Sequence, residues 1–391
     1  MNYQRFLGSL VVIGALAVPA LSQALKSEHL DNPSGLGAMQ ANWSTTREGD
    51  PILSWIEAQA DDTYNLRYAI RKAGHWSEPR TIIAKRQFFQ HPAEAPSITA
   101  LNDGTLLAEW IENPKKGSEA EFLYLSLSHD GVKWTPPVLA HKDRSMVQHG
   151  LASAISSGDH EASVFWLEAL QGEDGPVALK RTVLSTDGKI LKEEALDPDV
   201  CACCPTSVVK TAKGLMVAYR DHTASDIRDI AVLRLENGKW STSKIIYPDS
   251  WKINACPTNA AATAAKGDHV AVSWYTAANN SPVVKMVSSE DGGATFTKPL
   301  LISTGRAFGY TSIVLDDNGN AIVSWLESSG SGNAKILARQ VSKAGAAGPV
   351  VTITEGPRES LGYPHLLANG KDTFLAWAGV GDAKAETARL H

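Results

Sequence analysis

The chain has 391 residues, of which 43% are hydrophobic and 20% are charged, and its formal net charge is −5 at pH 7. The lysines are scattered and form no basic stripe, so composition excludes nucleic acid as an expected partner. After the N-terminal segment no stretch approaches the ~20 apolar residues of a spanning helix, which excludes a membrane span.

The first predicted element is a secretory signal peptide over residues 1–24. Arg5 precedes an uncharged apolar run over residues 6–20, and small residues follow that run in a cleavage pattern. We therefore expect a mature chain of residues 25–391 that is periplasmic or secreted and forms a single domain.

A repeated segment occurs seven times in the mature chain. Each copy has a turn, a short apolar run, an aromatic residue and often a carboxylate, as in the sequence around Trp55. The aromatic residues recur every 51 to 56 positions, at Trp55, Trp110, Trp166, Tyr219, Trp274, Trp325 and Trp377. A fixed period of this length with strand-like patterning predicts the blades of a β-propeller.

Each repeat is expected to contain four strands, and six of the repeats have a glycine turn between the third and fourth. The seventh repeat stops at its third strand, near residues 386–391. We expect residues 25–40 to supply the missing outer strand and so close the ring. The predicted fold is all-β with seven four-stranded blades, and six blades are the alternative.

Two of the glycine turns have a recognisable pattern. Residues 289–296 fit S-x-D-x-G-x-T-[FW], residues 128–134 are a version shortened by one, and residues 185–188 are a decayed copy. On these motifs the chain resembles the sialidase superfamily of BNR (Asp-box) repeat propellers. With its cysteine cluster it is similar to exported bacterial proteins of that superfamily. The resemblance implies a propeller fold in which the boxes are structural.

Strand alternation places the Asp boxes on one face and the loops entering each inner strand on the other. The second face is where propellers usually bind ligands. Cys204 and Cys256 hold the same position in consecutive repeats, each followed by Pro-Thr. We therefore expect the four cysteines, Cys201, Cys203, Cys204 and Cys256, to gather at the channel mouth.

The cysteines have three possible uses. One is a disulfide from Cys256 to Cys203 or Cys204, which an oxidising compartment favours. Another is a site for copper(I) or zinc formed by Cys203, Cys204, Cys256 and His149, with His91 and His365 nearby. The third is a redox-active disulfide.

A row of carboxylates is predicted where the second strand of several repeats ends, at Glu57, Glu112, Glu168, Asp221 and Glu327. Such acids either lie at solvated strand ends or form an acidic mouth that attracts a cation or a polyhydroxylated ligand. Arg220 and Asp221 interrupt the pattern beside the cysteines. Either they belong to an internal Arg-Asp network, or Arg220 binds ligand.

Catalysis of the sialidase type needs an arginine triad, a tyrosine nucleophile with a glutamate, and an acid/base aspartate, as the resemblance implies. No R-I-P motif occurs, and Arg220 and Arg306 do not complete a triad. The remaining catalytic candidates are Tyr310, Tyr363, Arg220 and Asp221. We favour a protein that binds a small ligand or a metal ion over an exo-alpha-sialidase-like glycoside hydrolase or a protein-interaction scaffold.

Overall fold

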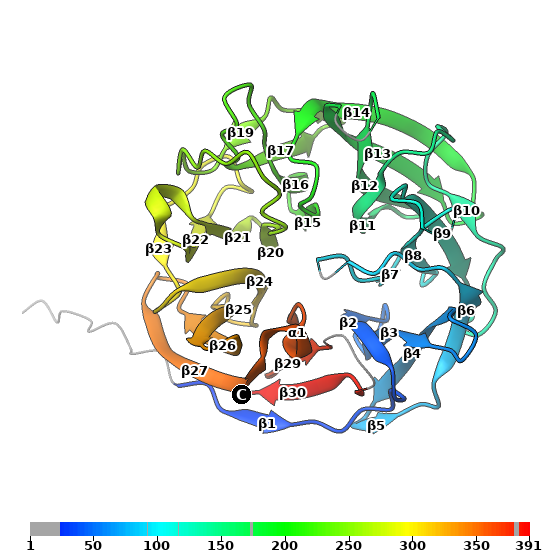
Figure 1. Cartoon of the computed structure of the whole chain (residues 1–391), viewed down its shortest axis with the longest axis horizontal. Coiled ribbons are helices and arrows are strands. Elements are labelled where there is room, and N and C mark those ends of the chain that lie inside the picture. The colour runs from blue at the N-terminus through cyan, green and yellow to red at the C-terminus, as the bar shows by residue number, and fades with distance from the viewer. Residues whose placement is uncertain (1–23, 92, 116, 173–174, 379–382) are drawn as a thin grey trace, which may run out of the picture.

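The computed structural model describes residues 24–91, 93–115, 117–172, 175–378 and 383–391. The predicted signal peptide, residues 1–24, lies outside this part of the chain except for its last residue. The described residues form seven antiparallel sheets around a central axis (Figure 1). This arrangement confirms the predicted all-β propeller and excludes the six-blade alternative.

The first three blades follow one another along the chain, each beginning with its innermost strand. Blade 1 contains β2 (Ala38–Thr45), β3 (Pro51–Ala58), β4 (Tyr64–Lys72), β5 (His75–Trp76) and β6 (Arg80–Arg86). Blade 2 contains β7 (Ser97–Ala100), β8 (Leu106–Glu112), β9 (Phe122–Ser128) and β10 (Val138–Leu139). Blade 3 contains β11 (His149–Gly158), β12 (Glu161–Ala169), β13 (Val177–Ser185) and β14 (Ile190–Val200).

The next three blades repeat this order. Blade 4 contains β15 (Ser207–Thr211), β16 (Gly214–Arg220), β17 (Ile230–Glu236), β18 (Lys239–Trp240) and β19 (Lys244–Ile245). Blade 5 contains β20 (Ala262–Lys266), β21 (His269–Thr276), β22 (Val283–Ser289) and β23 (Leu300–Leu301), with the short helix η1 (Ala278–Asn280) between β21 and β22. Blade 6 contains β24 (Ala307–Leu315), β25 (Ala321–Gly330), β26 (Asn333–Val341) and β27 (Ala347–Pro357).

Blade 7 joins the two ends of the chain. After the one-turn helix α1 (Arg358–Leu361) come β28 (His365–Asn369), β29 (Asp372–Trp377) and β30 (Glu386–Leu390), and β1 (Ser27–His29) is its outermost strand. Ser27 pairs with Leu390 in an antiparallel register, which confirms the predicted closure. The closing strand β1 is shorter than the expected range of residues 25–40, and residues 38–40 of that range belong to β2.

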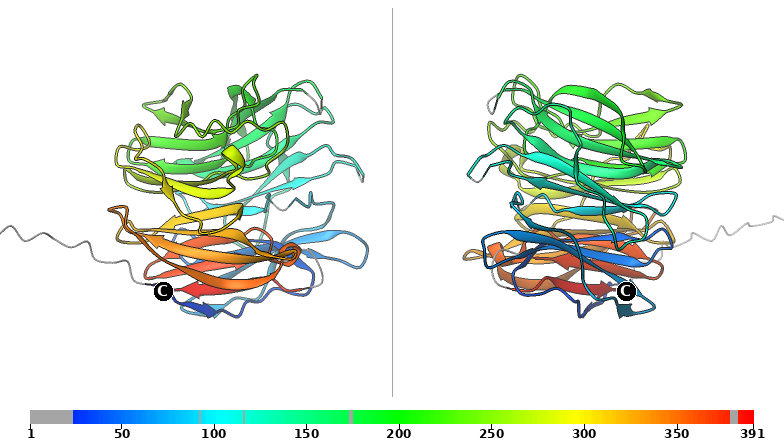
Figure 2. Two further views of the ribbon diagram at one scale, coloured as in Figure 1. Left: turned by 60° about the vertical axis from the view of Figure 1, so that its left-hand side comes forward. Right: turned by 90° about the vertical axis from the view of Figure 1, so that its right-hand side faces the viewer.

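The seven innermost strands form a closed ring. Each contacts the next in the order β2, β7, β11, β15, β20, β24 and β28, and β28 contacts β2. Figure 2 shows the blades side by side around this ring, with the C-terminus at the end of β30 beside β1. In the described part of the chain, no helix has the length and apolar character that crossing a bilayer requires.

The second strand of each blade is buried on both of its faces, as the continuous burial of β3 and β8 illustrates. This follows from the architecture, because each blade is covered by a neighbour on either side. The aromatic residue of each repeat lies in this strand and is at most 7% exposed in all seven blades. The aromatic period of the sequence therefore marks the packing between blades.

The turn at residues 289–296 has the predicted Asp-box geometry between β22 and β23. Asp291 accepts hydrogen bonds from the Thr295 amide at 2.8 Å and from Ser289 Oγ at 2.7 Å. Phe296 packs against Met216 and its neighbours between blades 4 and 5. These boxes are structural, and the opposite face carries the loops that enter the inner strands.

Candidate functional site

The cysteine loop joins the outer strand of blade 3 to the inner strand of blade 4. Its backbone is fixed at both ends, since the Cys201 amide donates to the Arg220 carbonyl at 3.0 Å and the Thr206 amide donates to the Leu151 carbonyl at 3.1 Å. The loop is therefore attached to both neighbouring blades and holds its cysteines in a defined arrangement.

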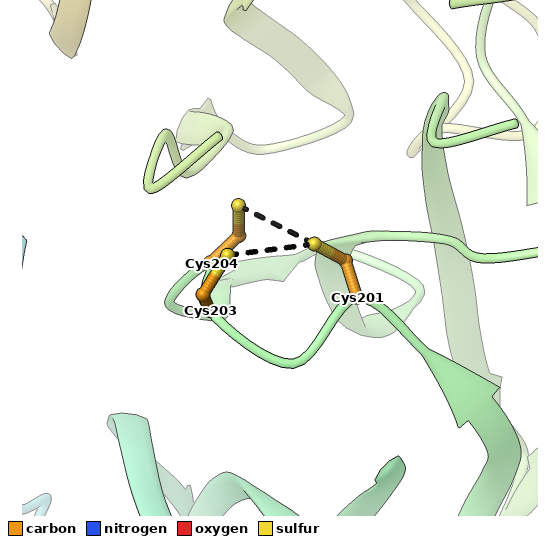
Figure 3. Close-up of side chains that lie close together, drawn as sticks. All are labelled: Cys201, Cys203 and Cys204. Atoms are coloured by element: carbon orange, nitrogen blue, oxygen red, sulfur yellow. Dashed lines mark hydrogen bonds between the residues drawn. The ribbon is translucent and has the colours of Figure 1, made fainter. Parts of the chain in front are cut away.

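Three thiols of this loop converge on one point (Figure 3). The Sγ of Cys201 lies 3.9 Å from that of Cys203 and 3.8 Å from that of Cys204, and the three sulfurs lie within 4.8 Å of one another. Thiolates bound to one zinc ion at Zn–S distances of about 2.3 Å are separated by about 3.8 Å in a tetrahedron. The spacing thus fits three ligands of a single metal ion.

Hydrogen-bond donors surround these sulfurs. Arg228 donates from Nη1 to Cys201 Sγ at 3.2 Å, and the Asn259 amide donates to Cys204 Sγ at 3.3 Å. Hydrogen bonds with Cys203 and then Cys204 hold the pKa of Cys201 well below its usual range, against the effect of burial. Burial is the main reason that the pKa of Cys204 rises to about 12. In the apo protein, negative charge is therefore favoured on Cys201.

Cys256, which comes from the loop of the next blade, lies outside this group of three sulfurs and lines a cavity together with Cys203. A hydrogen bond with Cys203 lowers the pKa of Cys256 to about 7, and Arg228 acts in the same direction. The side chain of Cys256 is exposed, whereas Cys201 and Cys204 are each 1% exposed. All four cysteines are free thiols, so the structure lends no support to the disulfide expected from Cys256 to Cys203 or Cys204.

His149 lies away from the thiols. Its ring stacks on His141 with centroids 3.9 Å apart and contacts Phe122 and Trp166 in the packing between blades. It is fully buried, and its Nδ1 faces the carbonyls of Glu121 and Val147. His149, expected beside the cysteines, therefore has a packing environment and lies outside the group of three thiols.

Arg220 also has an internal position. Its Nε and Nη2 donate to the Asn259 carbonyl at 3.2 and 3.0 Å, and its other bonds reach the carbonyls of Tyr275 and Arg228. It is 1% exposed and lies over the Trp251 ring. The expected internal network is thus built on backbone carbonyls rather than on Asp221, and it fixes Asn259 against the cysteine loop.

Asp221 lies on the other side of this network, paired through its backbone with Val200. Burial, followed by the charge of Asp197, raises the pKa of Asp221 to about 6. It is not among the residues that surround Tyr310 and Tyr363. The tyrosine candidates are therefore not brought together with Asp221, and the acid that lines their cavity is Glu359.

Tyr310 and Tyr363 stack on each other at the channel mouth, with ring centroids 4.6 Å apart. Tyr310 has a φ of 52° within a bulge of β24, an unusual backbone for a bulky residue. Its hydroxyl accepts from Arg358 at 3.3 Å, and that of Tyr363 accepts from the Ala260 amide at 3.3 Å. In the described residues neither hydroxyl bonds a carboxylate.

The expected row of carboxylates neither lies at solvated strand ends nor forms an acidic mouth. Glu57, Glu112 and Glu327 each accept a hydrogen bond from the indole N–H of the tryptophan two residues earlier, at 3.2, 2.6 and 3.0 Å. Glu112 also pairs with Arg86 at 2.8 Å. Since alternation places the acid on the same strand face as the tryptophan, these carboxylates serve the packing between blades.

Three further glutamates, which sequence patterns did not single out, are buried in blade 2 and in the loops that enter its strands. Glu94, Glu109 and Glu121 are at most 9% exposed, and the Oε2 of each lacks a hydrogen-bond partner among the described residues. Burial raises the pKa of Glu109 to about 7 and that of Glu121 to about 8. Gly150 permits the close approach of Glu121, since a Cβ there would lie 2.5 Å from its Oε2.

A wide cleft of about 1080 Å³ opens on the channel face over blades 5 and 6. Lys252, Arg306 and Arg358 line it, and among its described lining residues none is acidic. In the described part of the chain, no carboxylate lies within ion-pair distance of these three cations, and Arg358 instead packs over Phe308. The cleft is therefore electropositive and partly aromatic.

The sequence profile of the BNR repeat-like domain matches residues 44–323 of this chain. No curated protein sequence matches it. Among solved structures, similar ones include the BP39L lectin from Burkholderia pseudomallei, with 13% identity, a TM-score of 0.60, and coverage of 90% of this chain and 96% of the lectin.

Two enzymes are similar in structure as well. The alpha-L-arabinanase of Penicillium chrysogenum has 12% identity and a TM-score of 0.52 over 94% of this chain and 98% of its own. The K499G mutant of NanB sialidase from Streptococcus pneumoniae has 14% identity and a TM-score of 0.47 over 93% of this chain and 71% of its own. At these identities the likenesses to the lectin and the arabinanase establish the fold alone.

Proposed function

This chain belongs to the BNR repeat-like domain family, and we propose that it uses the propeller as a rigid support for binding one soft metal ion, copper(I) or zinc, at the channel mouth. The proposal concerns the cysteine cluster, because a fold shared by lectins and hydrolases does not determine an activity.

The observation that carries this proposal is the convergence of the three sulfurs of Cys201, Cys203 and Cys204 at spacings of 3.8 and 3.9 Å. Thiolates prefer soft or borderline ions such as copper(I) and zinc over calcium or magnesium. Three thiolates on one ion leave an excess negative charge, and Arg228 with the Asn259 amide would offset it. Cys256 lies outside this group of three sulfurs, so the proposed site has three protein thiolates.

The test uses protein exported to its native compartment. Intact mass under nonreducing conditions would give four free thiols, and elemental analysis would give one equivalent of copper or zinc per chain. Two disulfides without metal would overturn the proposal. The N-terminal sequence of the same sample tests the proposed export, which predicts a chain that begins at Leu25.

A second candidate function is binding of an acidic ligand in the cleft of Lys252, Arg306 and Arg358. Three cations without a carboxylate partner favour an anion, and Tyr275 and Phe308 supply aromatic surface beside them. This candidate describes binding alone, because among the described residues neither tyrosine hydroxyl is hydrogen-bonded to a carboxylate that would activate it as a nucleophile.

Isothermal titration with acidic and neutral forms of one oligosaccharide tests this second candidate. Binding of the acidic form that weakens with salt and with Arg306→Gln would support it, and equal binding of both forms would contradict it. Release of 4-methylumbelliferone from a sialoside, lost on mutation of Tyr310 or Tyr363, would instead favour the hydrolase alternative.

A further inference from the structure

A small cavity of about 210 Å³ lies beside the cysteine loop. Its lining includes Cys203, Cys256, Glu121, Gln148 and His91. Cys201 and Cys204 do not line it. The cluster of four cysteines is therefore divided into two thiols that face a cavity and two that are enclosed.

Exposure follows the same division. Cys256 is exposed and Cys203 is half-buried, whereas Cys201 and Cys204 are buried beneath them. Cys203 belongs to both groups, because it lines the cavity together with Cys256 and its Sγ lies 3.9 Å from that of Cys201. An ion arriving from solvent therefore meets the Cys203 and Cys256 pair before the enclosed pair.

The loops that carry these residues are held in a fixed relation. The Asn259 amide, three residues after Cys256, donates to Cys204 Sγ at 3.3 Å, and Arg220 holds the Asn259 carbonyl. The loop of blade 5 is thus anchored at the enclosed thiols, while Cys256 lies nearer to solvent. Gln148, which also lines the cavity, is attached to the cysteine loop, since its Nε2 donates to the Ala202 carbonyl at 2.8 Å.

We propose that metal reaches the cluster through this cavity, binding first to Cys203 and Cys256 and then moving to the enclosed site of Cys201, Cys203 and Cys204. This inference rests on the proposed metal-binding function and adds the route and order of loading. Cys203 holds the ion throughout, and Cys256 is exchanged for Cys201 and Cys204.

The steps are ligand exchanges without electron transfer. In the first step, each bond from the ion to Cys203 or Cys256 replaces an S–H bond or uses an existing thiolate, and it replaces one bond between the ion and its delivering ligand. In the second step, bonds to Cys201 and Cys204 replace the bond to Cys256 and the last bond to the delivering ligand, and Cys256 leaves as a thiolate or takes up a proton. Any thiol proton leaves to solvent or to the departing ligand, and copper remains monovalent or zinc divalent throughout. The delivering species is a small complex of the ion with labile soft ligands.

The experiment follows copper(I) transfer from its bicinchoninate complex to the apo protein by stopped-flow absorbance, with affinity measured separately at equilibrium. Cys256→Ser is expected to slow loading about tenfold while the equilibrium affinity changes by less than about threefold. Cys201→Ser is the matched control, and it is expected to retain the fast first step but to lose at least about a hundredfold in affinity.

A second measurement does not require metal. Brief iodoacetamide treatment of the apo protein, mapped by mass spectrometry, is expected to modify Cys256 and Cys203 before Cys201 and Cys204. Equal labelling of all four, or loading of Cys256→Ser at the wild-type rate, would overturn the route. If the wild-type protein takes up neither copper(I) nor zinc, the proposed function fails, and the route fails with it.

Discussion

Arg228 donates a hydrogen bond from Nη1 to Cys201 Sγ across 3.2 Å, while its Nε donates to the Ile253 carbonyl at 3.0 Å. One guanidinium therefore links the cysteine loop to the segment that carries Cys256. This position places a fixed positive charge beside the sulfur that most readily becomes a thiolate. The arrangement stabilises an anionic cluster before any ion binds.

Arg228→Gln should weaken metal binding because it removes that charge and the bond to Cys201. A hydrogen bond to a charged group contributes about 1.5 to 3 kcal/mol, so the affinity is expected to fall about tenfold or more. Competition with a chromophoric chelator measures the loss. Arg228→Lys should retain part of the affinity, and Arg306→Gln, a cation on the same face without a thiol contact, should leave it unchanged. Equal affinities for Arg228→Gln and wild type would contradict the assigned role.

His149→Phe should leave metal stoichiometry at the wild-type value, because the ring is packed against His141 and Trp166 away from the sulfurs. Its expected cost is in stability, about 1 to 3 kcal/mol, since phenylalanine cannot reproduce the contacts of Nδ1 with buried carbonyls. Urea unfolding and elemental analysis of the same samples separate the two effects. Loss of metal without loss of stability would show that His149 is a metal ligand.

The propeller was predictable because its repeat places the same residue type at the same blade position. Trp55 and Trp377 were expected in neighbouring blades, and their clusters confirm this, with Phe374 packed among the residues around Trp55. The same counting gave Cys204 and Cys256 equal positions in consecutive repeats, whose inner strands β15 and β20 are in contact, but it is Cys203 that lines a cavity with Cys256.

Side-chain direction was less predictable. His149 begins β11, where a bulge at Leu151 with a φ of 58° interrupts the alternation that counting assumes. Arg228 lies in a loop outside the repeated pattern of the blades, so counting repeats could not predict its contact with Cys201. Glu57 and Glu112 were expected either at solvated strand ends or in an acidic mouth, because a repeated W-x-E motif does not reveal that the acid accepts the indole N–H.

Glu109→Gln should make the protein more stable at alkaline pH. Burial raises the pKa of Glu109 to about 7, so the folded state binds this proton more tightly than the unfolded state, whose carboxyl titrates near 4.5. Stability from this group is present below about pH 4.5 and is lost as the pH rises through about 7. At pH 8.5 the variant is expected to gain about 1 to 3 kcal/mol, with little difference at pH 4.5.

Glu112→Gln, on the same strand, provides the opposite case. Glu112 is 7% exposed and pairs with Arg86 at 2.8 Å, so its neutralisation leaves that guanidinium without its partner. This variant should be less stable than wild type at neutral pH in the same urea titrations. A Glu109→Gln variant that loses stability at pH 8.5 as Glu112→Gln does would show that Glu109 is ionised and paired.

The closure of the ring can be tested at a single amide. Lys26 and His391 exchange backbone hydrogen bonds, and the Leu30 amide donates to the Thr387 carbonyl. Since bonded pairs alternate along an antiparallel ladder, Glu28 and Arg389 form the bonded pair between them, and the Ser27 amide points away from β30.

Glu28→Pro should therefore destabilise the protein by about 1 to 3 kcal/mol, because it removes a ladder donor. Ser27→Pro removes an amide that makes no ladder bond, and Glu28→Ala isolates the surface ion pairs, so both should cost less than about 1 kcal/mol. Equal unfolding midpoints for Glu28→Pro and Ser27→Pro would show that the pairing of β1 with β30 contributes little to the stability of the closed propeller.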